Sequence, residues 1–314
     1  MESDSKINYS IRPSKSIERN MILEVLKEVC PPTTVNDYRY IGFGSCFFID
    51  FKMFHRSLSI KDMISIEGSN DEGKQKRCFF NRPFNCIDIK FGFSTDILPK
   101  IGWDKKSIVW LDYDDPFDTF MFEDIQTCMS NLKSSSLFII TLEGEFFQKS
   151  IDEFYKYFGE QVPSGLKQID IEPLNCIKLM RKLFIDKINE VLVNTYSAVC
   201  EQHKLIFKQL FNITYKDSKK MYTFGGMVIN KSEEKEFLNF KFNSYPFITD
   251  SENAIDISFP IITNKEYHHL NNFLPSEKQN FINNPNIDFI PESHKISYFD
   301  TYRFYPPYIE IKDF

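Results

Sequence analysis

The residues best suited to chemistry are three carboxylates in the run DYDDPF, residues 112–117, which follows the apolar segment SIVWL. Three carboxylates at one strand end repel one another unless they meet a cation, a ligand donor or a basic side chain. Asp112 and Asp114 are therefore the candidate catalytic residues, as a base or as groups that orient a substrate. Asp115 is a candidate substrate contact. The simpler alternative is a solvated strand end.

A Gly-x-Gly turn, formed by Gly42 and Gly44 and followed by Ser45, joins a predicted strand to a Phe-rich helical pattern. Such a turn lets a ligand approach bare backbone, but it can also be a plain tight turn. Glu67 ends the next short strand of the sequence. Its two carboxylate oxygens could accept hydrogen bonds from both hydroxyls of a ribose.

Three basic residues, Arg12, Lys15 and Arg19, lie close together around the start of a helical pattern at residues 16–30. If this helix folds over a cleft, their side chains could hold a phosphate or a carboxylate of the substrate. A solvated helix face is the ordinary alternative.

The elements that would position these residues alternate between short apolar strands and helical patterns. This alternation predicts a mostly parallel sheet covered on both faces by helices. A hairpin around the turn KDSKK would close one edge of the sheet, with its second strand antiparallel to the rest. The predicted parallel strands are RYIGFGS with its turn, DMISIEG, NCIDIKFG, the beginning of SIVWLDYDDPF, and SSSLFIITLEG. The predicted hairpin strands are KLIFKQLFNITY and KMYTFGGMVI.

The predicted fold class is α/β, a Rossmann-like sheet with an N-terminal helix and an α+β C-terminal appendage. We divide the chain into an N-terminal helical segment (1–36), the Rossmann-like domain (37–231) and the appendage (232–314), where the texture becomes rich in aromatics and Asn. Within the appendage we expect strands in FKFNSYPFI and AIDISFPII and a short helix in EYHHLNNFL. In an open parallel sheet, ligands bind where loops leave the carboxyl ends of the strands.

Composition narrows the functional classes. The net charge of −6 does not advertise nucleic-acid binding. Seven scattered cysteines without a CxxC pair argue against a disulfide framework and a structural zinc site. No apolar run approaches the roughly 20 residues of a membrane span, and the N-terminus lacks a signal-peptide core. We therefore expect a cytoplasmic protein without a membrane partner.

Taken together, the residues at the strand ends resemble the class I S-adenosylmethionine-dependent methyltransferases. More narrowly, RPSKSIER, YIGFGS, GFSTDILP and WLDYDDPF make the chain similar to a bacterial family of O-methyltransferases. The resemblance implies S-adenosylmethionine as cofactor and methyl transfer, most naturally to oxygen. It also implies a set of cofactor contacts. These are Gly42, Gly44, Ser45, Glu67, Ser94, Thr95, Asp96, Asp112 and Tyr113.

Two positions depart from the usual glycine loop of these enzymes. Tyr40 stands where the loop normally opens with an acidic residue, and Cys46 stands at its third glycine. These departures motivate an alternative function, a catalytically silent module that keeps the fold and binds a nucleotide or a protein. A dinucleotide-dependent oxidoreductase is less favoured, because Phe47 occupies the last glycine of the GxGxxG pattern.

The sequence leaves the methyl acceptor open between a small molecule, a nucleotide or nucleic acid, and a protein side chain. The aromatic appendage makes a homodimer or a protein partner plausible. No metal site is predicted, although a magnesium ion between Asp112 or Asp114 and Glu143 is an alternative, since hard oxygen ligands suit that ion.

Overall fold

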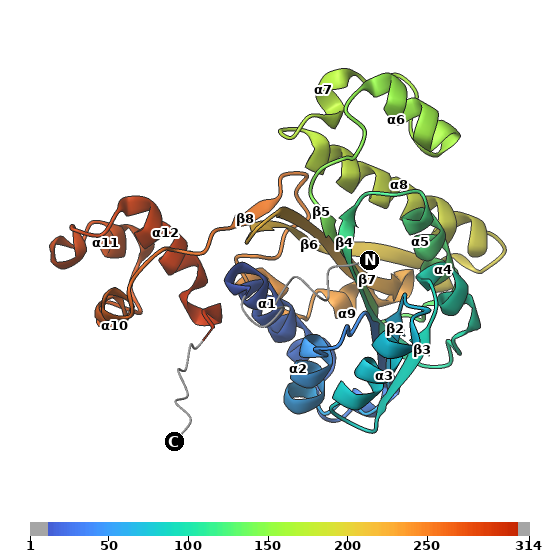
Figure 1. The fold of residues 1–314 in the computed structure, drawn as a ribbon, viewed down its shortest axis with the longest axis horizontal. Coiled ribbons are helices and arrows are strands. Elements are labelled where there is room, and N and C mark those ends of the chain that lie inside the picture. Colours follow the sequence, from blue (N-terminus) through green and yellow to red (C-terminus); the bar gives the residue numbers. More distant parts are fainter. Residues whose placement is uncertain (1–11, 307–314) are drawn as a thin grey trace.

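The computed structural model describes residues 12–306. Its centre is one eight-stranded sheet in the order β3-β2-β1-β4-β5-β7-β6-β8 (Figure 1). The first five strands of this order run parallel, as the sequence predicts. Their bounds are β1 Tyr38–Gly42, β2 Met63–Glu67, β3 Ile87–Phe91, β4 Lys106–Pro116 and β5 Ser136–Glu143.

The predicted hairpin and its reversed strand are confirmed. Strand β7 (Lys220–Asn230) runs antiparallel to both β5 and β6 (Leu205–Lys216), so it is the reversed strand within the sheet. A short strand, β8 (Ile255–Ile257), then pairs in parallel with β6 and extends the same edge.

Both faces of the sheet are buried, which explains why its central strands are almost wholly apolar. In β4, Ile108 and Trp110 point to one face and Val109 and Leu111 to the other, and all four are at most 1% exposed. Helices α1 and α2 cover the first face, and α5 and α8 cover the second. The helices up to α8 are α1 Pro13–Val29, α2 Ile49–Leu58, α3 Glu72–Asn81, α4 Ser94–Ile97, α5 Phe120–Asn131, α6 Ile151–Phe158, α7 Gln168–Ile171 and α8 Cys176–Thr195.

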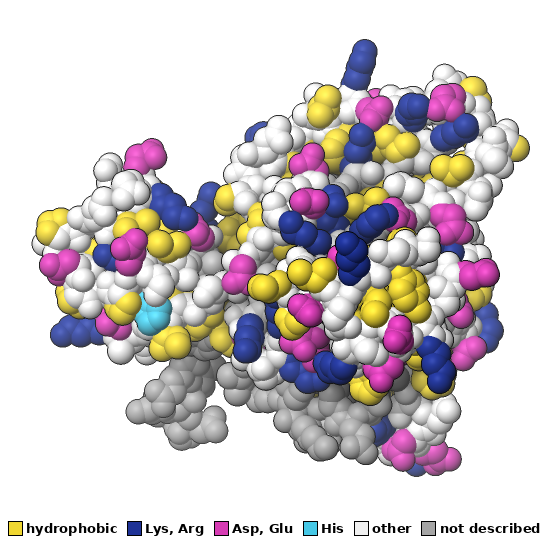
Figure 2. Space-filling model, turned by 90° about the horizontal axis from the view of Figure 1, so that it is seen from above, with side chains coloured by type: hydrophobic (Ala, Val, Ile, Leu, Met, Phe, Trp, Pro, Cys, Tyr) yellow, Lys and Arg dark blue, Asp and Glu magenta, His cyan; other side chains and the backbone are white. Residues whose placement is uncertain are grey.

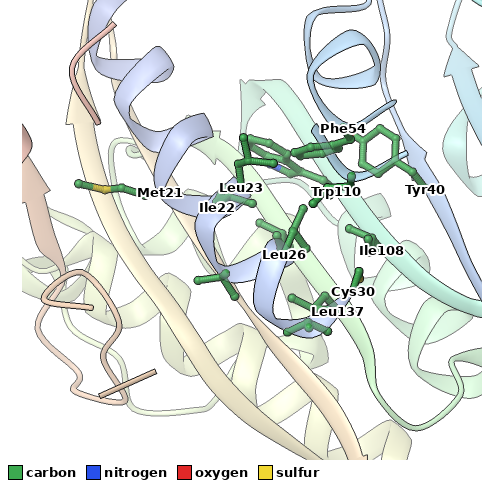
Figure 3. Packing of buried hydrophobic residues seen from close by; sticks show 14 of the residues in the cluster. Met21, Ile22, Leu23, Leu26, Cys30, Tyr40, Phe54, Ile108, Trp110 and Leu137 are labelled. Atoms are coloured by element: carbon green, nitrogen blue, oxygen red, sulfur yellow. The ribbon is translucent and has the colours of Figure 1, made fainter. Parts of the chain in front are cut away.

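Helix α1 is part of the main core. Its apolar stripe, including Ile22 and Leu26, packs toward Ile108 and Trp110 of β4 (Figure 3). Burial of one such side chain contributes roughly 1.5–3 kcal/mol, so the apolar stripe fixes α1 firmly on the sheet. The polar residues at the N-terminal end of α1 are thereby held next to the carboxyl end of β4.

The chain after β7 first packs along the sheet and then leaves it. Helix α9 (Glu234–Phe237) and β8 lie against the sheet, while α10 (Asn264–Asn271), α11 (Lys278–Ile282) and α12 (Glu292–Thr301) project as a separate lobe (Figure 1). This lobe has its own small core. The fully buried members of that core are Leu270, Phe281, Ile287, Ile290 and Tyr298.

Two strand predictions in this region need correction. The segment 240–248 forms a 3-10 helix at Lys241–Ser244 and no strand, because Phe242 and Phe247 both turn into the main core instead of alternating between two faces. In the segment 254–262, only Ile255–Ile257 is a strand. The predicted short helix at 266–274 is confirmed as α10, although it begins at Asn264.

The surface shows no large area of one charge on the face drawn in Figure 2, where acidic and basic side chains are interspersed. Among the helices of residues 12–306, none combines the length and the apolar character that crossing a membrane requires.

Candidate functional site

A pocket of about 540 Å³ opens where β1, β2, β3 and β4 end, and this size is typical of small-molecule sites. Loops after four neighbouring strands converge there, as the parallel topology requires. Helices α1, α3 and α5 supply further walls. Among the candidate residues, the pocket is lined by Gly44, Ser45, Glu67, Ser94, Thr95, Asp112, Tyr113, Asp114, Asp115 and Arg19.

Four candidate residues are not among those that line the pocket: Gly42, Asp96, Arg12 and Lys15. A Cβ on Gly42 would lie 2.6 Å from the Tyr40 hydroxyl and 2.9 Å from the Trp110 carbonyl oxygen. Glycine is therefore needed here for packing, and the predicted cofactor contact of Gly42 stays a prediction. Asp96 is exposed on the short helix α4 and is not among the residues that line the pocket, so its predicted contact stays a prediction as well.

The other two are basic residues of α1. Lys15 is fully buried and is not among the residues that line the pocket. Arg12 caps the start of α1, with its Nε 3.8 Å from Asp217 Oδ2. Both side chains serve ion pairs within the protein, and the predicted substrate contacts of Lys15 and Arg12 stay predictions.

The glycine turn is fixed to the end of β2. Glu67 Oε1 accepts hydrogen bonds from Gly44 N at 3.0 Å and from Ser65 Oγ at 2.6 Å. A Cβ at position 44 would lie 2.5 Å from Ser65 Oγ and 2.6 Å from the Phe48 ring, so only glycine fits. Glu67 is only 8% exposed, but it lines the pocket. Its carboxylate therefore lies beside the backbone of Gly44 at the pocket wall.

Left-handed backbone at two non-glycine residues gives the turn its shape. Ser45 has φ 48° and Phe48 has φ 49°, and α2 begins directly afterwards at Ile49. Such conformations are uncommon outside glycine and asparagine. They explain how the turn accommodates Cys46 without a third glycine, because the chain makes an extra turn before the helix starts.

Aromatic rings form one wall of the pocket. Tyr113 lies edge-on to Phe43 and to Phe120, with ring centroids 5.1 Å and 5.5 Å apart. Phe93, which is 58% exposed, lies at the pocket as well. The sequence analysis missed the three phenylalanines. Phe43 and Phe93 each follow the glycine that ends a strand, and this shared Gly-Phe step was the available signal.

A buried carboxylic acid supports this wall from behind. Asp124 on α5 accepts hydrogen bonds from the hydroxyls of Ser94 and Tyr113. Burial raises the pKa of Asp124 to about 6, against the lowering effect of these two donors. Nothing in the sequence pattern singles out Asp124, since it occupies a helix position that could equally be solvated.

The carboxylate of Asp112 at the pocket is ion-paired to a lysine below it. Lys15 Nζ lies 2.9 Å from Asp112 Oδ1 and 2.8 Å from Glu18 Oε2, and it also lies 4.5 Å from the centroid of the Trp110 ring. Burial raises the pKa of Glu18, partly offset by Lys15. Thr223 donates a hydrogen bond to the other oxygen of Glu18. Asp112 is therefore held in place from inside the protein.

Arg19 reaches the pocket in a buried ion pair. Its Nε donates to Asp50 Oδ1 at 2.5 Å, and its side chain is 8% exposed. Burial alone would lower the pKa of Arg19, but the carboxylates of Asp50 and Asp112 raise it overall. Asp50 is its hydrogen-bond partner among the described residues, which leaves its Nη groups for a ligand. The pairing with Asp50, 31 positions away, was not predictable from sequence.

Glu143, which the alternative magnesium site would share with Asp112 or Asp114, is paired with a lysine. Glu143 Oε2 pairs with Lys219 Nζ at 2.7 Å. Within residues 12–306, no three His, Cys, Asp or Glu side chains are grouped as metal ligands would be.

Comparison with known families was made against this geometry. The profile of a family described as "Putative O-methyltransferase" matches residues 7–313, nearly the whole chain. The chain belongs to this O-methyltransferase family. No curated protein matches it.

The solved structures that resemble this chain include methyltransferases and a spermidine synthase. Spermidine synthase from Thermotoga maritima is 15% identical, with a TM-score of 0.39, over 77% of this chain and 68% of that one. The O-methyltransferase TomG from Streptomyces achromogenes, in complex with S-adenosylmethionine, is 10% identical, with a TM-score of 0.36, over 68% and 80%. An O-methyltransferase family protein from Burkholderia thailandensis is 10% identical, with a TM-score of 0.34, over 67% and 55%.

Within the family's α/β fold, the strand order accounts for the site. Neighbouring β1 and β4 place the glycine turn beside the acidic end of β4, and β2 places Glu67 on the other side of the turn.

Proposed function

We propose that this family member is an S-adenosylmethionine-dependent methyltransferase that acts on an oxygen of a small-molecule acceptor. The observation that carries the proposal is convergence on one pocket. Bare backbone at Gly44, the carboxylate of Glu67, the aromatic wall around Tyr113 and the acidic end of β4 all meet there.

The pocket residues fit the parts of this cofactor. Glu67 offers a carboxylate for the ribose hydroxyls, and the backbone of Gly44 lines the pocket beside it. Ser94 and Thr95, with Phe93, suit a polar and flat adenine. At the other side, Arg19 and Asp50 offer opposite charges to the carboxylate and ammonium of an amino-acid end. Arg19, a substrate contact in our sequence analysis, is thus assigned to the cofactor.

The reaction needs positioning more than covalent chemistry. When bound, S-adenosylmethionine supplies an electrophilic methyl group. Lys15 holds the carboxylate of Asp112 in place, so Asp112 is suited to orient an acceptor hydroxyl. Asp114 and Asp115 also line the pocket, and either could take the proton that the hydroxyl loses. The aromatic wall restricts water on the side of Phe43 and Phe120.

Isothermal titration with S-adenosylhomocysteine, the product form of the cofactor, tests the proposal. We expect saturable binding with a dissociation constant below about 100 µM, equivalent to about 5.5 kcal/mol. Glu67→Gln should weaken it at least about tenfold, because the amide carries an N–H donor in place of one acceptor oxygen. Glu160→Gln, at an exposed position far along the chain, is the matched control. Folded protein without detectable binding at millimolar ligand would exclude the proposal.

A catalytically silent module remains a second candidate, because one observation favours it. Asp112, the leading candidate for the base, is committed to an ion pair with Lys15, and Cys46 replaces a loop glycine. Such a module would bind the cofactor but transfer nothing, and its partner would bind elsewhere, for example on the α10–α12 lobe. Incubation of cell extract with methyl-labelled cofactor separates the two candidates. Label in small molecules supports the enzyme, and label in no fraction supports the module.

A further inference from the structure

Two cysteines meet at the wall of the pocket. Cys46 lies in the turn between β1 and α2, and Cys78 lies on α3. Their sulfur atoms are 3.3 Å apart, and the side chains are 8% and 4% exposed. Cys78 also lines the pocket, so its side chain borders the space that a small molecule would enter. No sequence pattern pairs these residues, which are 32 positions apart.

The other cysteines of the described chain have different surroundings. Cys86 lies 3.6 Å from His55 Nδ1, and Cys176 donates to the carbonyl of Gly144. Cys200 is exposed. The contact between Cys46 and Cys78 is therefore a specific feature of the site and not a general crowding of thiols.

We propose that Cys46 and Cys78 form a reversible disulfide when the protein meets a peroxide, and that this disulfide weakens cofactor binding. The second half of this proposal rests on the proposed function. A disulfide has an S–S distance of about 2.05 Å, so the sulfurs must approach by a little over 1 Å. A shift of this size is within reach of a turn and an exposed, ten-residue helix.

The chemistry balances with a peroxide as the oxidant. The Cys78 thiol gives up its proton and its sulfur attacks one peroxide oxygen. The O–O bond breaks, the departing hydroxide takes up that proton, and a sulfenic acid and one water form. The Cys46 thiol then attacks the sulfur of the sulfenic acid, the S–O bond breaks, and a second water leaves. Two thiols and one hydrogen peroxide thus give one disulfide and two waters. A dithiol reductant returns both thiols by exchange.

The disulfide would act on the pocket through two of its walls. It would tie the glycine turn to α3, which also carries the pocket residue Lys74. A shift of the turn at Gly44 would also displace Ser65 or Phe48, because both side chains lie close to the Gly44 backbone. The expected result is a narrower pocket and an S-adenosylhomocysteine affinity at least about fivefold lower than in the reduced protein.

Mass spectrometry of the full-length protein tests the disulfide directly. The protein is treated with hydrogen peroxide under native conditions, alkylated and digested with trypsin. We expect a crosslink between peptides 40–52 and 78–90, removed by dithiothreitol. Because peptide 78–90 also contains Cys86, Cys86→Ser is the matched control and should keep the crosslink. Cys78→Ser and Cys46→Ser should each abolish it.

Calorimetry with S-adenosylhomocysteine on the same samples tests the consequence. Oxidised wild-type protein should bind more weakly and recover after reduction, whereas Cys78→Ser should be insensitive to peroxide. Absence of the crosslink, or a crosslink with unchanged affinity, overturns the inference. Absence of binding by the reduced protein would instead count against the proposed function, and the crosslink would still decide the thiol pair.

Discussion

Lys15 Nζ lies 2.9 Å from Asp112 Oδ1, although the two residues are 97 positions apart. Lys15 belongs to α1 and Asp112 to the end of β4, so the contact joins the N-terminal helix to the pocket. Lys15 is fully buried and also pairs with buried Glu18. One cation therefore balances two carboxylates, and its removal leaves Glu18 buried without its partner.

We predict that Lys15→Met lowers the free energy of unfolding by about 3–5 kcal/mol, the usual result of breaking a buried ion pair. Urea unfolding followed by circular dichroism measures this. Adding Glu18→Gln to the Lys15→Met variant should recover part of the loss, because the unpaired charge is then removed. Lys27→Met, where the lysine side chain is 47% exposed, is the control and should change stability little. An equal, small effect of both lysine variants would refute the structural role.

The second prediction concerns Arg19 and the amino-acid end of the cofactor. Arg19→Gln should weaken binding of S-adenosylhomocysteine about tenfold, equivalent to about 1.4 kcal/mol, because a charge-assisted hydrogen bond is lost. Methylthioadenosine lacks the amino-acid end, so its affinity should change less than about twofold. Titration of both ligands into both proteins provides the comparison. If the two affinities fell equally, Arg19 would be acting only through its contact with Asp50.

The third prediction concerns the glycine turn. Gly44→Ala should lower the free energy of unfolding by about 1–3 kcal/mol, because its Cβ would overlap Ser65 and Phe48. Gly102→Ala is the matched control, since its Cβ would come no closer than 3.4 Å to a neighbouring side chain. Thermal unfolding of the two variants should separate them by several degrees. Similar melting temperatures would show that the turn can relax.

The sheet was predictable from sequence because its signals are local and redundant. Apolar segments such as SIVWL are buried on both faces, and each ends at a glycine or an acidic run that marks the strand end. Parallel topology then gathers those ends at one edge, which placed Gly44, Glu67 and Asp112 together. The strand prediction for segment 240–248 failed because its aromatic residues pack into the main core. Such packing produces no regular spacing of apolar residues in the sequence.

The inner structure of the site was not predictable, because it depends on pairs distant in sequence. From its position in the sequence, Lys15 could be a substrate contact or part of a solvated helix face. In the fold, the apolar stripe of α1 packs on the sheet, and this places the Lys15 ammonium against Asp112. The Gly-x-Gly pattern made Gly42 a candidate ligand contact. In the fold, a side chain at this position would collide with the Tyr40 hydroxyl. Such distinctions between contact and support depend on the three-dimensional neighbours of each residue.

The last prediction follows from the raised pKa of Asp124. Its pKa is about 6 in the folded protein, against an ordinary value of 3.8 for an aspartate. The folded state therefore binds the proton more tightly than the unfolded chain. The resulting stabilisation of the fold is fully present below pH 3.8 and is lost as the pH rises through about 6. Between pH 7 and pH 5, wild-type protein should gain about 1 kcal/mol of unfolding free energy relative to Asp124→Asn.

Urea unfolding of both proteins at pH 7, 6 and 5 measures this difference, and the other titrating groups cancel in the comparison. Asp152→Asn, at an exposed position on α6, is the control and should track the wild type at each pH. The asparagine keeps an acceptor for the hydroxyls of Ser94 and Tyr113, so the variant should stay folded. A difference that stays constant, or that grows toward pH 7 in favour of the wild type, would show that burial does not hold the proton on Asp124.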